Sequence, residues 1–66
     1  MKVRINGEHI LLQEQASIAT VIAERKINPK VVVVECNGVI LPRGDWDQVL
    51  LKDEDTLEIV SFVGGG

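Results

Sequence analysis

The residues best suited to chemistry are the last ones, where the apolar pair Phe62-Val63 is followed by Gly64, Gly65 and Gly66. Glycine has no Cβ, so such a tail can adopt backbone angles closed to other residues and can enter a narrow channel. Three extended residues would reach roughly 10 Å, at ~3.3–3.6 Å per residue. The pattern favours a terminal carboxylate presented to the active site of another protein. A frayed terminus is the alternative that the tail alone leaves open.

Two single residues, Cys36 and His9, also have reactive side chains. Strand alternation places Glu35 toward solvent and Cys36 inward, where an unpaired cysteine usually behaves as a small hydrophobe. His9 has no nucleophile or base near it in the sequence, and a lone histidine is weak evidence for catalysis. We interpret Cys36 as structural and His9 as a surface residue. Because no triad spacing or phosphate-binding loop is found, we expect no catalytic residue and no enzymatic activity.

The acidic run Asp53-Glu54-Asp55 could be read as a divalent-cation site, but consecutive carboxylates lack the spaced ligands of a calcium loop. We expect a solvated acidic turn, with partner recognition as its second reading and Asp55 as a cap of the next strand. Trp46, the only tryptophan, is expected to pack in the core or as a lid on it. No metal ligand is therefore predicted.

Composition limits the chain to one small domain of 66 residues. Its single cysteine excludes an internal disulfide, so packing must hold the fold. The net charge is −3 and the only aromatic residues are Trp46 and Phe62, whereas nucleic-acid binding calls for a basic stripe and stacking aromatics. Without a signal peptide or a membrane-length apolar run, we expect a cytoplasmic protein with no nucleic-acid or membrane partner.

Periodicity and turn residues predict the order of the elements. Asn6-Gly7 and Asn37-Gly38 indicate tight turns, because both residue types tolerate a positive φ. The helix is expected to begin after its N-cap Ser17 and to end at Asn28-Pro29, since the residue before proline is pushed out of the helical region. Its core face carries Ile18, Val21, Ile22 and the stem of Arg25. Strands are predicted at Lys2–Asn6, His9–Leu12, Val31–Asn37, Val39–Leu41 and Thr56–Val63.

A hairpin, a crossing helix and later strands that return beside the first predict an α+β fold of the β-grasp type. The helix would cross one face of a mixed sheet of four to five strands. The last strand would lie beside the first, inside the sheet. We expect residues 1–63 to form this domain and residues 64–66 to form a flexible glycine tail.

Strand alternation also predicts a docking surface. Glu58 is not comfortably buried, so its neighbours Leu57 and Ile59 should face the helix. The open face of the sheet would then carry an apolar patch of the kind that marks protein contacts. A bulge that turns Phe62 back into the core is the alternative. The predicted docking residues are Val33, Val60, Phe62 and Val63.

The segment Asn37–Arg43, with Trp46, Asp55–Val60 and Val63–Gly66, gives the chain a family resemblance. It resembles the sulfur carrier proteins of thiamine biosynthesis, the ThiS type of the ubiquitin-like β-grasp family. The resemblance spans the whole chain in length and element order and is most specific from Asn37 onward. The final glycine pair alone is weakly specific, since ubiquitin and the small subunit of molybdopterin synthase also end in it.

This resemblance implies a protein cosubstrate. A ThiF-type adenylyltransferase would use ATP to convert the Gly66 carboxylate into an acyl-adenylate. A sulfur-donating enzyme would replace AMP and leave a thiocarboxylate, and a thiazole synthase would take the sulfur for the thiazole of thiamine. Gly64 and Gly65 would thread into these partners. No cofactor is implied on the chain itself.

Three other functions stay open from the sequence. A carrier of the molybdopterin-synthase type would deliver sulfur to a different acceptor. A ubiquitin-like modifier would be conjugated through Gly66 to a lysine of a target protein. A binding domain whose tail has no role would keep its function without Gly65 and Gly66.

Overall fold

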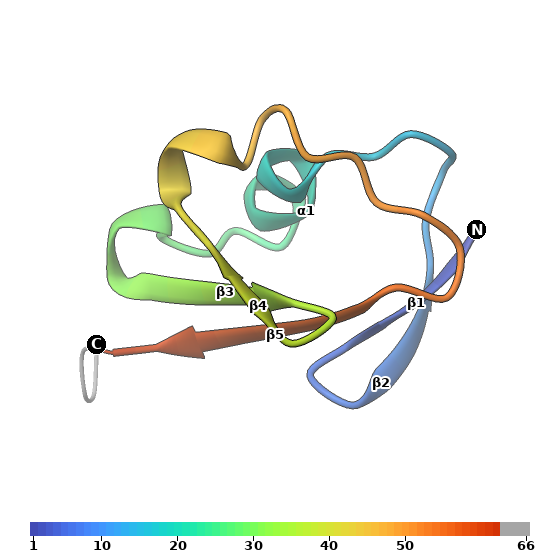
Figure 1. Cartoon of the computed structure of the whole chain (residues 1–66), viewed down its shortest axis with the longest axis horizontal. Helices are drawn as coiled ribbons and strands as arrows, with labels where there is room; N and C mark the ends of the chain where they lie inside the picture. Colours follow the sequence, from blue (N-terminus) through green and yellow to red (C-terminus); the bar gives the residue numbers. More distant parts are fainter. Residues whose placement is uncertain (63–66) are drawn as a thin grey trace.

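The computed structural model describes residues 1–62, which form a five-stranded sheet with one α-helix packed on one face (Figure 1). The strand order is β2-β1-β5-β3-β4. The predicted element order and β-grasp arrangement are therefore confirmed. The elements are β1 (Lys2–Ile5), β2 (Glu8–Leu11), α1 (Ile18–Glu24), β3 (Val32–Cys36), β4 (Val39–Leu41) and β5 (Thr56–Ser61), with short 3-10 turns at Pro29–Val31 and Arg43–Asp45.

Both predicted asparagine-glycine turns close hairpins. Asn6 and Gly7 join β1 to β2 with φ values of 51° and 86°, and Asn37 and Gly38 join β3 to β4 with 51° and 85°. Two successive residues of positive φ give the turn whose twist matches that of the flanking strands. These turns fix the register of both hairpins, β1–β2 and β3–β4.

Strand β5 lies in the centre of the sheet, parallel to β1 and antiparallel to β3. Its backbone pairing with β1 spans only two residue pairs, and the side chain of Asn6 extends it. Asn6 Nδ2 donates to the Ile59 carbonyl at 3.1 Å, and the Ile59 N–H donates to Asn6 Oδ1 at 2.7 Å. On the other side, the Thr56 N–H donates to Asn37 Oδ1 at 2.9 Å. Strand β5 is thus held from both flanks by the turns as well as by its neighbours.

The helix begins as predicted and ends earlier than predicted. Ser17 Oγ accepts the Thr20 N–H at 3.0 Å, as an N-cap does. The end predicted at Asn28-Pro29 is wrong, because α1 stops at Glu24. Lys26 adopts a left-handed φ of 58°, and its N–H donates to Ala23 O while the N–H of Ile27 donates to Ile22 O. This pair of bonds closes the helix in a Schellman motif.

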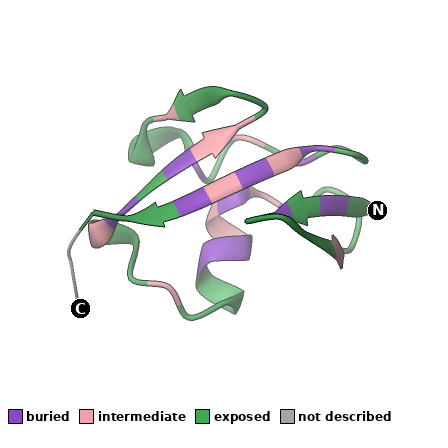
Figure 2. Cartoon of the chain, turned by 90° about the horizontal axis from the view of Figure 1, so that it is seen from below, coloured by how far each residue is buried: buried purple, intermediate pink, exposed green. Residues whose placement is uncertain are grey.

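Ile18, Val21 and Ile22 of the helix are buried against the sheet, whereas Arg25, predicted on the same face, is exposed. Figure 2 shows the alternation of buried and more exposed residues along β5. Trp46 is buried, and its Nε1–H donates to the Leu41 carbonyl at 3.0 Å, which confirms the predicted packing role. The buried cluster consists of Val3, Ile5, Ile18, Val21, Ile22, Val32, Val34, Trp46, Leu51, Leu57 and Ile59.

The acidic turn is only partly solvated, so that expectation is wrong for Asp55, which is 8% exposed. Its Oδ1 accepts from Asn37 Nδ2 at 2.9 Å, and its Oδ2 accepts from the Lys52 N–H at 2.8 Å. A carboxylate is stabilised in such a place because both oxygens receive donors. The predicted capping role of Asp55 is confirmed, while Asp53 and Glu54 are exposed.

We predict that Asn6→Gly lowers the free energy of unfolding by about 1–3 kcal/mol, because it removes two hydrogen bonds to β5 while allowing the same positive φ. Urea denaturation measures the change. Asn6→Asp should also destabilise, since it replaces the donor by an oxygen that faces the Ile59 carbonyl. An unchanged unfolding midpoint for Asn6→Gly would show that the amide does not hold β5.

Candidate functional site

The candidate site lies at the end of β5, where the Phe62 N–H donates to the Val31 carbonyl at 2.9 Å. This bond fixes the backbone at the last residue that the structure describes. The predicted modification residue Gly66, the threading residues Gly64 and Gly65, and Val63 lie outside the described residues. The boundary predicted after residue 63 also lies there and stays a prediction.

The open face of the sheet carries the apolar side chains that alternation predicted. Val60 and Phe62 are each 58% exposed and Val33 is 38% exposed. Val33 lies directly opposite Val60 in the β3–β5 pair. Leu57 and Ile59 are buried on the helix side. The predicted exposure is confirmed, Phe62 is not turned into the core, and the docking role itself stays a prediction.

The sequence interpretation missed one member of this face, Ile40 in β4. Ile40 lies opposite Glu35 and is exposed, whereas Leu41 lies opposite the buried Val34 and is half-buried. Alternation along Val39–Leu41 was the available signal, but three residues do not reveal which face is buried unless the pairing with β3 is known.

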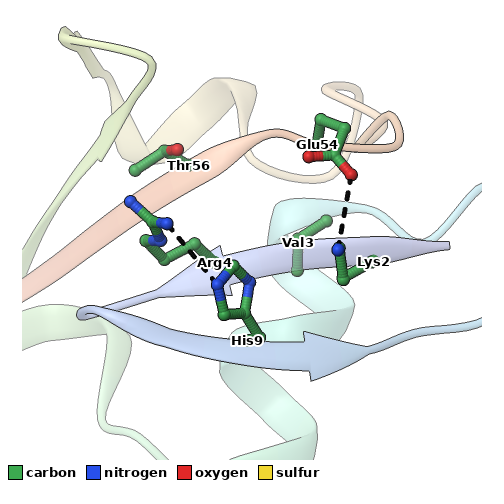
Figure 3. Close-up of a pocket in the computed structure, with 6 residues that line it drawn as sticks. All are labelled: Lys2, Val3, Arg4, His9, Glu54 and Thr56. Atoms are coloured by element: carbon green, nitrogen blue, oxygen red, sulfur yellow. Dashed lines mark hydrogen bonds and ion pairs between the residues drawn. The ribbon is translucent and has the colours of Figure 1, made fainter.

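A shallow polar hollow of about 120 Å³ lies over β1, β2 and the start of β5 (Figure 3). Arg4 and His9 point toward each other, with 3.5 Å between Arg4 Nη2 and His9 Nε2. Lys2 Nζ lies 3.9 Å from Glu54 Oε1. His9 is exposed, as predicted. The described residues that line the hollow do not combine a cysteine or serine nucleophile with a general base.

Cys36 is half-buried at the edge of the core, on the face that alternation predicted. Burial raises the pKa of the Cys36 thiol above its ordinary value, the Asp55 carboxylate raises it further, and Lys52 lowers it. The thiolate is the reactive form of cysteine, and it is disfavoured here. The geometry therefore supports a structural role.

Neither a candidate metal site nor a membrane-spanning helix is found in residues 1–62. No group of three or more histidine, cysteine, aspartate or glutamate side chains in this range could hold a metal ion. No helix in the same range is long and apolar enough to cross a membrane.

Comparison with known proteins identifies the family. The family model described as the ThiS family matches residues 2–66. The chain belongs to the ThiS family. A solved structure, the ThiS thiamine biosynthesis protein from Geobacter metallireducens, superposes with a TM-score of 0.87 at 30% identity, with both chains fully covered.

Curated relatives extend this result. The sulfur carrier protein ThiS of Bacillus subtilis is 34% identical over 64 residues, which are 96% of this chain and 97% of that protein. A thiazole synthase of Paramagnetospirillum magneticum is 38% identical over all 66 residues. The chain spans only about a fifth of the length of the thiazole synthases that it matches. A ThiS-like segment is therefore present within longer proteins of that name.

We predict that Cys36 is alkylated by iodoacetamide at neutral pH more slowly in the folded protein than in the protein unfolded by urea. The reason is that its raised pKa leaves little thiolate. Intact mass spectrometry over time measures both rates. Equal alkylation rates in the folded and unfolded protein would contradict a half-buried Cys36 thiol with a raised pKa.

Proposed function

We propose that this ThiS-family chain carries sulfur for thiamine biosynthesis as a thiocarboxylate at Gly66. In the first step, a carboxylate oxygen of Gly66 attacks the α-phosphorus of ATP on a ThiF-type adenylyltransferase, and pyrophosphate leaves. In the second step, hydrosulfide released by a sulfur-donating enzyme attacks the acyl carbon through its sulfur, the acyl–phosphate bond breaks, and AMP leaves. The resulting thiocarboxylate sulfur is then transferred to the growing thiazole by a thiazole synthase.

The observation that carries this proposal is the match of the ThiS family to residues 2–66, which includes the glycine tail. The name of the Bacillus relative describes that protein as a sulfur carrier, over nearly its whole length. The fold supports the same role, because a central strand bonded on both sides leads directly to the tail. Because the backbone is hydrogen-bonded at Phe62, the directions in which the chain can present Gly66 to a partner are limited.

Adenylation supplies a good leaving group, without which a free carboxylate is a poor acyl donor. The carrier supplies no catalytic group in this proposal, and ATP is bound by the partner. Cys36 takes no part, because its thiol is half-buried and its pKa is raised. We therefore assign the activation of Gly66 and the delivery of sulfur to the partner enzymes. We further propose that all of these reactions take place in the cytoplasm.

Among the partners, the thiazole synthase has direct support. Two relatives named thiazole synthase contain a segment similar to this entire chain. A carrier segment within the same polypeptide as an acceptor enzyme would have a high effective concentration at its active site. We propose that this chain meets a thiazole synthase as a separate partner of the same kind.

The decisive experiment is ATP–pyrophosphate exchange with the adenylyltransferase encoded in the same genome. We predict that the chain ending at Gly66 supports exchange. Deletion of Gly66, or extension beyond it, should abolish exchange, because both remove the carboxylate that attacks ATP. Thermal unfolding serves as the control and should be unchanged, since the buried cluster lies within residues 3–59. Exchange that survives the deletion would refute the proposal.

We further predict that Val60→Asp weakens binding to the adenylyltransferase at least about tenfold, because it introduces a charge into the apolar patch of the open face. Val39→Asp is a matched control. Val39 is 60% exposed, similar to Val60 at 58%, but it lies opposite the inward-facing Cys36. Isothermal titration calorimetry measures both affinities. Equal weakening by the two variants would show that binding does not depend on this face.

A further inference from the structure

Two glutamates lie directly opposite each other on the open face. Glu35 of β3 pairs with Glu58 of β5 in the antiparallel register, and both are half-buried. The neighbouring residues Val34 and Leu57 are fully buried on the helix side. Because side chains alternate along a strand, both carboxylates must lie on the face that α1 does not cover.

Like charges at directly opposite positions destabilise a strand pair. Neither carboxylate forms an ion pair with a cation of residues 1–62, where the ion pairs are Met1 with Glu14 and Lys2 with Glu54. Arg4 is in register with Thr56, two residues from Glu58, but its guanidinium lies beside His9. The free carrier therefore holds two adjacent negative charges without a bonded cation from the described part of the chain.

Exposed apolar side chains border this glutamate pair on two sides, toward β4 and toward the end of β5. Ile40 lies opposite Glu35 in β4, and the Val33–Val60 pair lies one step along the same face toward the tail. Phe62 extends the apolar surface to the end of the described chain. When a partner is bound, apolar side chains beside the glutamate pair exclude water from the interface, and the interaction of the glutamates with a positive charge becomes stronger.

We propose that this face docks an apolar protein surface with a central arginine or lysine that inserts between Glu35 and Glu58. The inference rests on the proposed function and assigns this basic surface to the adenylyltransferase that acts on Gly66. An arginine suits the position well, because its planar fork can donate to two carboxylates at once. Nucleic acids and anionic membranes carry the wrong charge for the pair.

The test is the double variant Glu35→Gln/Glu58→Gln, which keeps the side-chain shapes and removes both charges. Its matched control is Glu24→Gln/Asp47→Asn, which removes two exposed charges from α1 and from the segment after the second 3-10 turn. The probe is the adenylyltransferase encoded in the same genome, titrated calorimetrically without ATP. We expect the Kd to rise at least about tenfold for the double variant and to stay within about twofold for the control.

A second measurement separates binding from folding. The double variant should unfold at the same or a higher temperature than the wild type, since it relieves repulsion between the two strands. The wild-type Kd should also rise with salt concentration, because a charge pair contributes to binding. Loss of affinity together with retained or increased stability is the expected signature.

Several results would overturn the inference. They are an unchanged Kd for the double variant, equal weakening by the control, a lower unfolding temperature for the double variant, or a wild-type Kd independent of salt. Dimerisation of the wild type that the double variant abolishes would assign the face to a second copy of the chain. A wild type that binds the adenylyltransferase but supports no ATP–pyrophosphate exchange would refute the proposed function. The Kd values of the variants would still test whether Glu35 and Glu58 contribute to docking.

Discussion

The pairing of β5 with strands on both sides is the constraint on which the rest of the structure depends. The last strand that the structure describes, β5, lies at the centre of the sheet between β1 and β3. Its parallel contact with β1 is short, so the Asn6 amide supplies two further hydrogen bonds at Ile59. The sheet is therefore completed only when the strand that precedes the glycine tail is in place.

Alternation along the same strand separates the core residues from the residues of the proposed docking face. Leu57 and Ile59 point to the helix and complete the core, whereas Glu58, Val60 and Phe62 are left for the other face. A substitution on one face can thus change binding without removing core contacts. In a chain of this size, this division allows a recognition surface to be built on the strand that also holds the fold together.

The features predictable from sequence were those with local causes, such as the Asn6-Gly7 turn and the Ser17 cap. The end of the helix was not predictable, because Lys26 adopts the left-handed conformation in which glycine is usually found. The burial of Asp55 depends on Asn37, a partner distant in sequence. The opposition of two glutamates on the open face likewise follows from strand register, which alternation within one strand does not determine.

The central claim is that Gly66 carries sulfur, and intact-mass analysis of the protein produced with its native C-terminus tests it most directly. After incubation with ATP, the adenylyltransferase and a sulfur donor, we predict a species heavier by the difference between one sulfur and one oxygen atom. Fragmentation should place the added mass on Gly66. An unchanged mass in a reaction that consumes ATP, or added mass on Cys36 instead, would contradict the account.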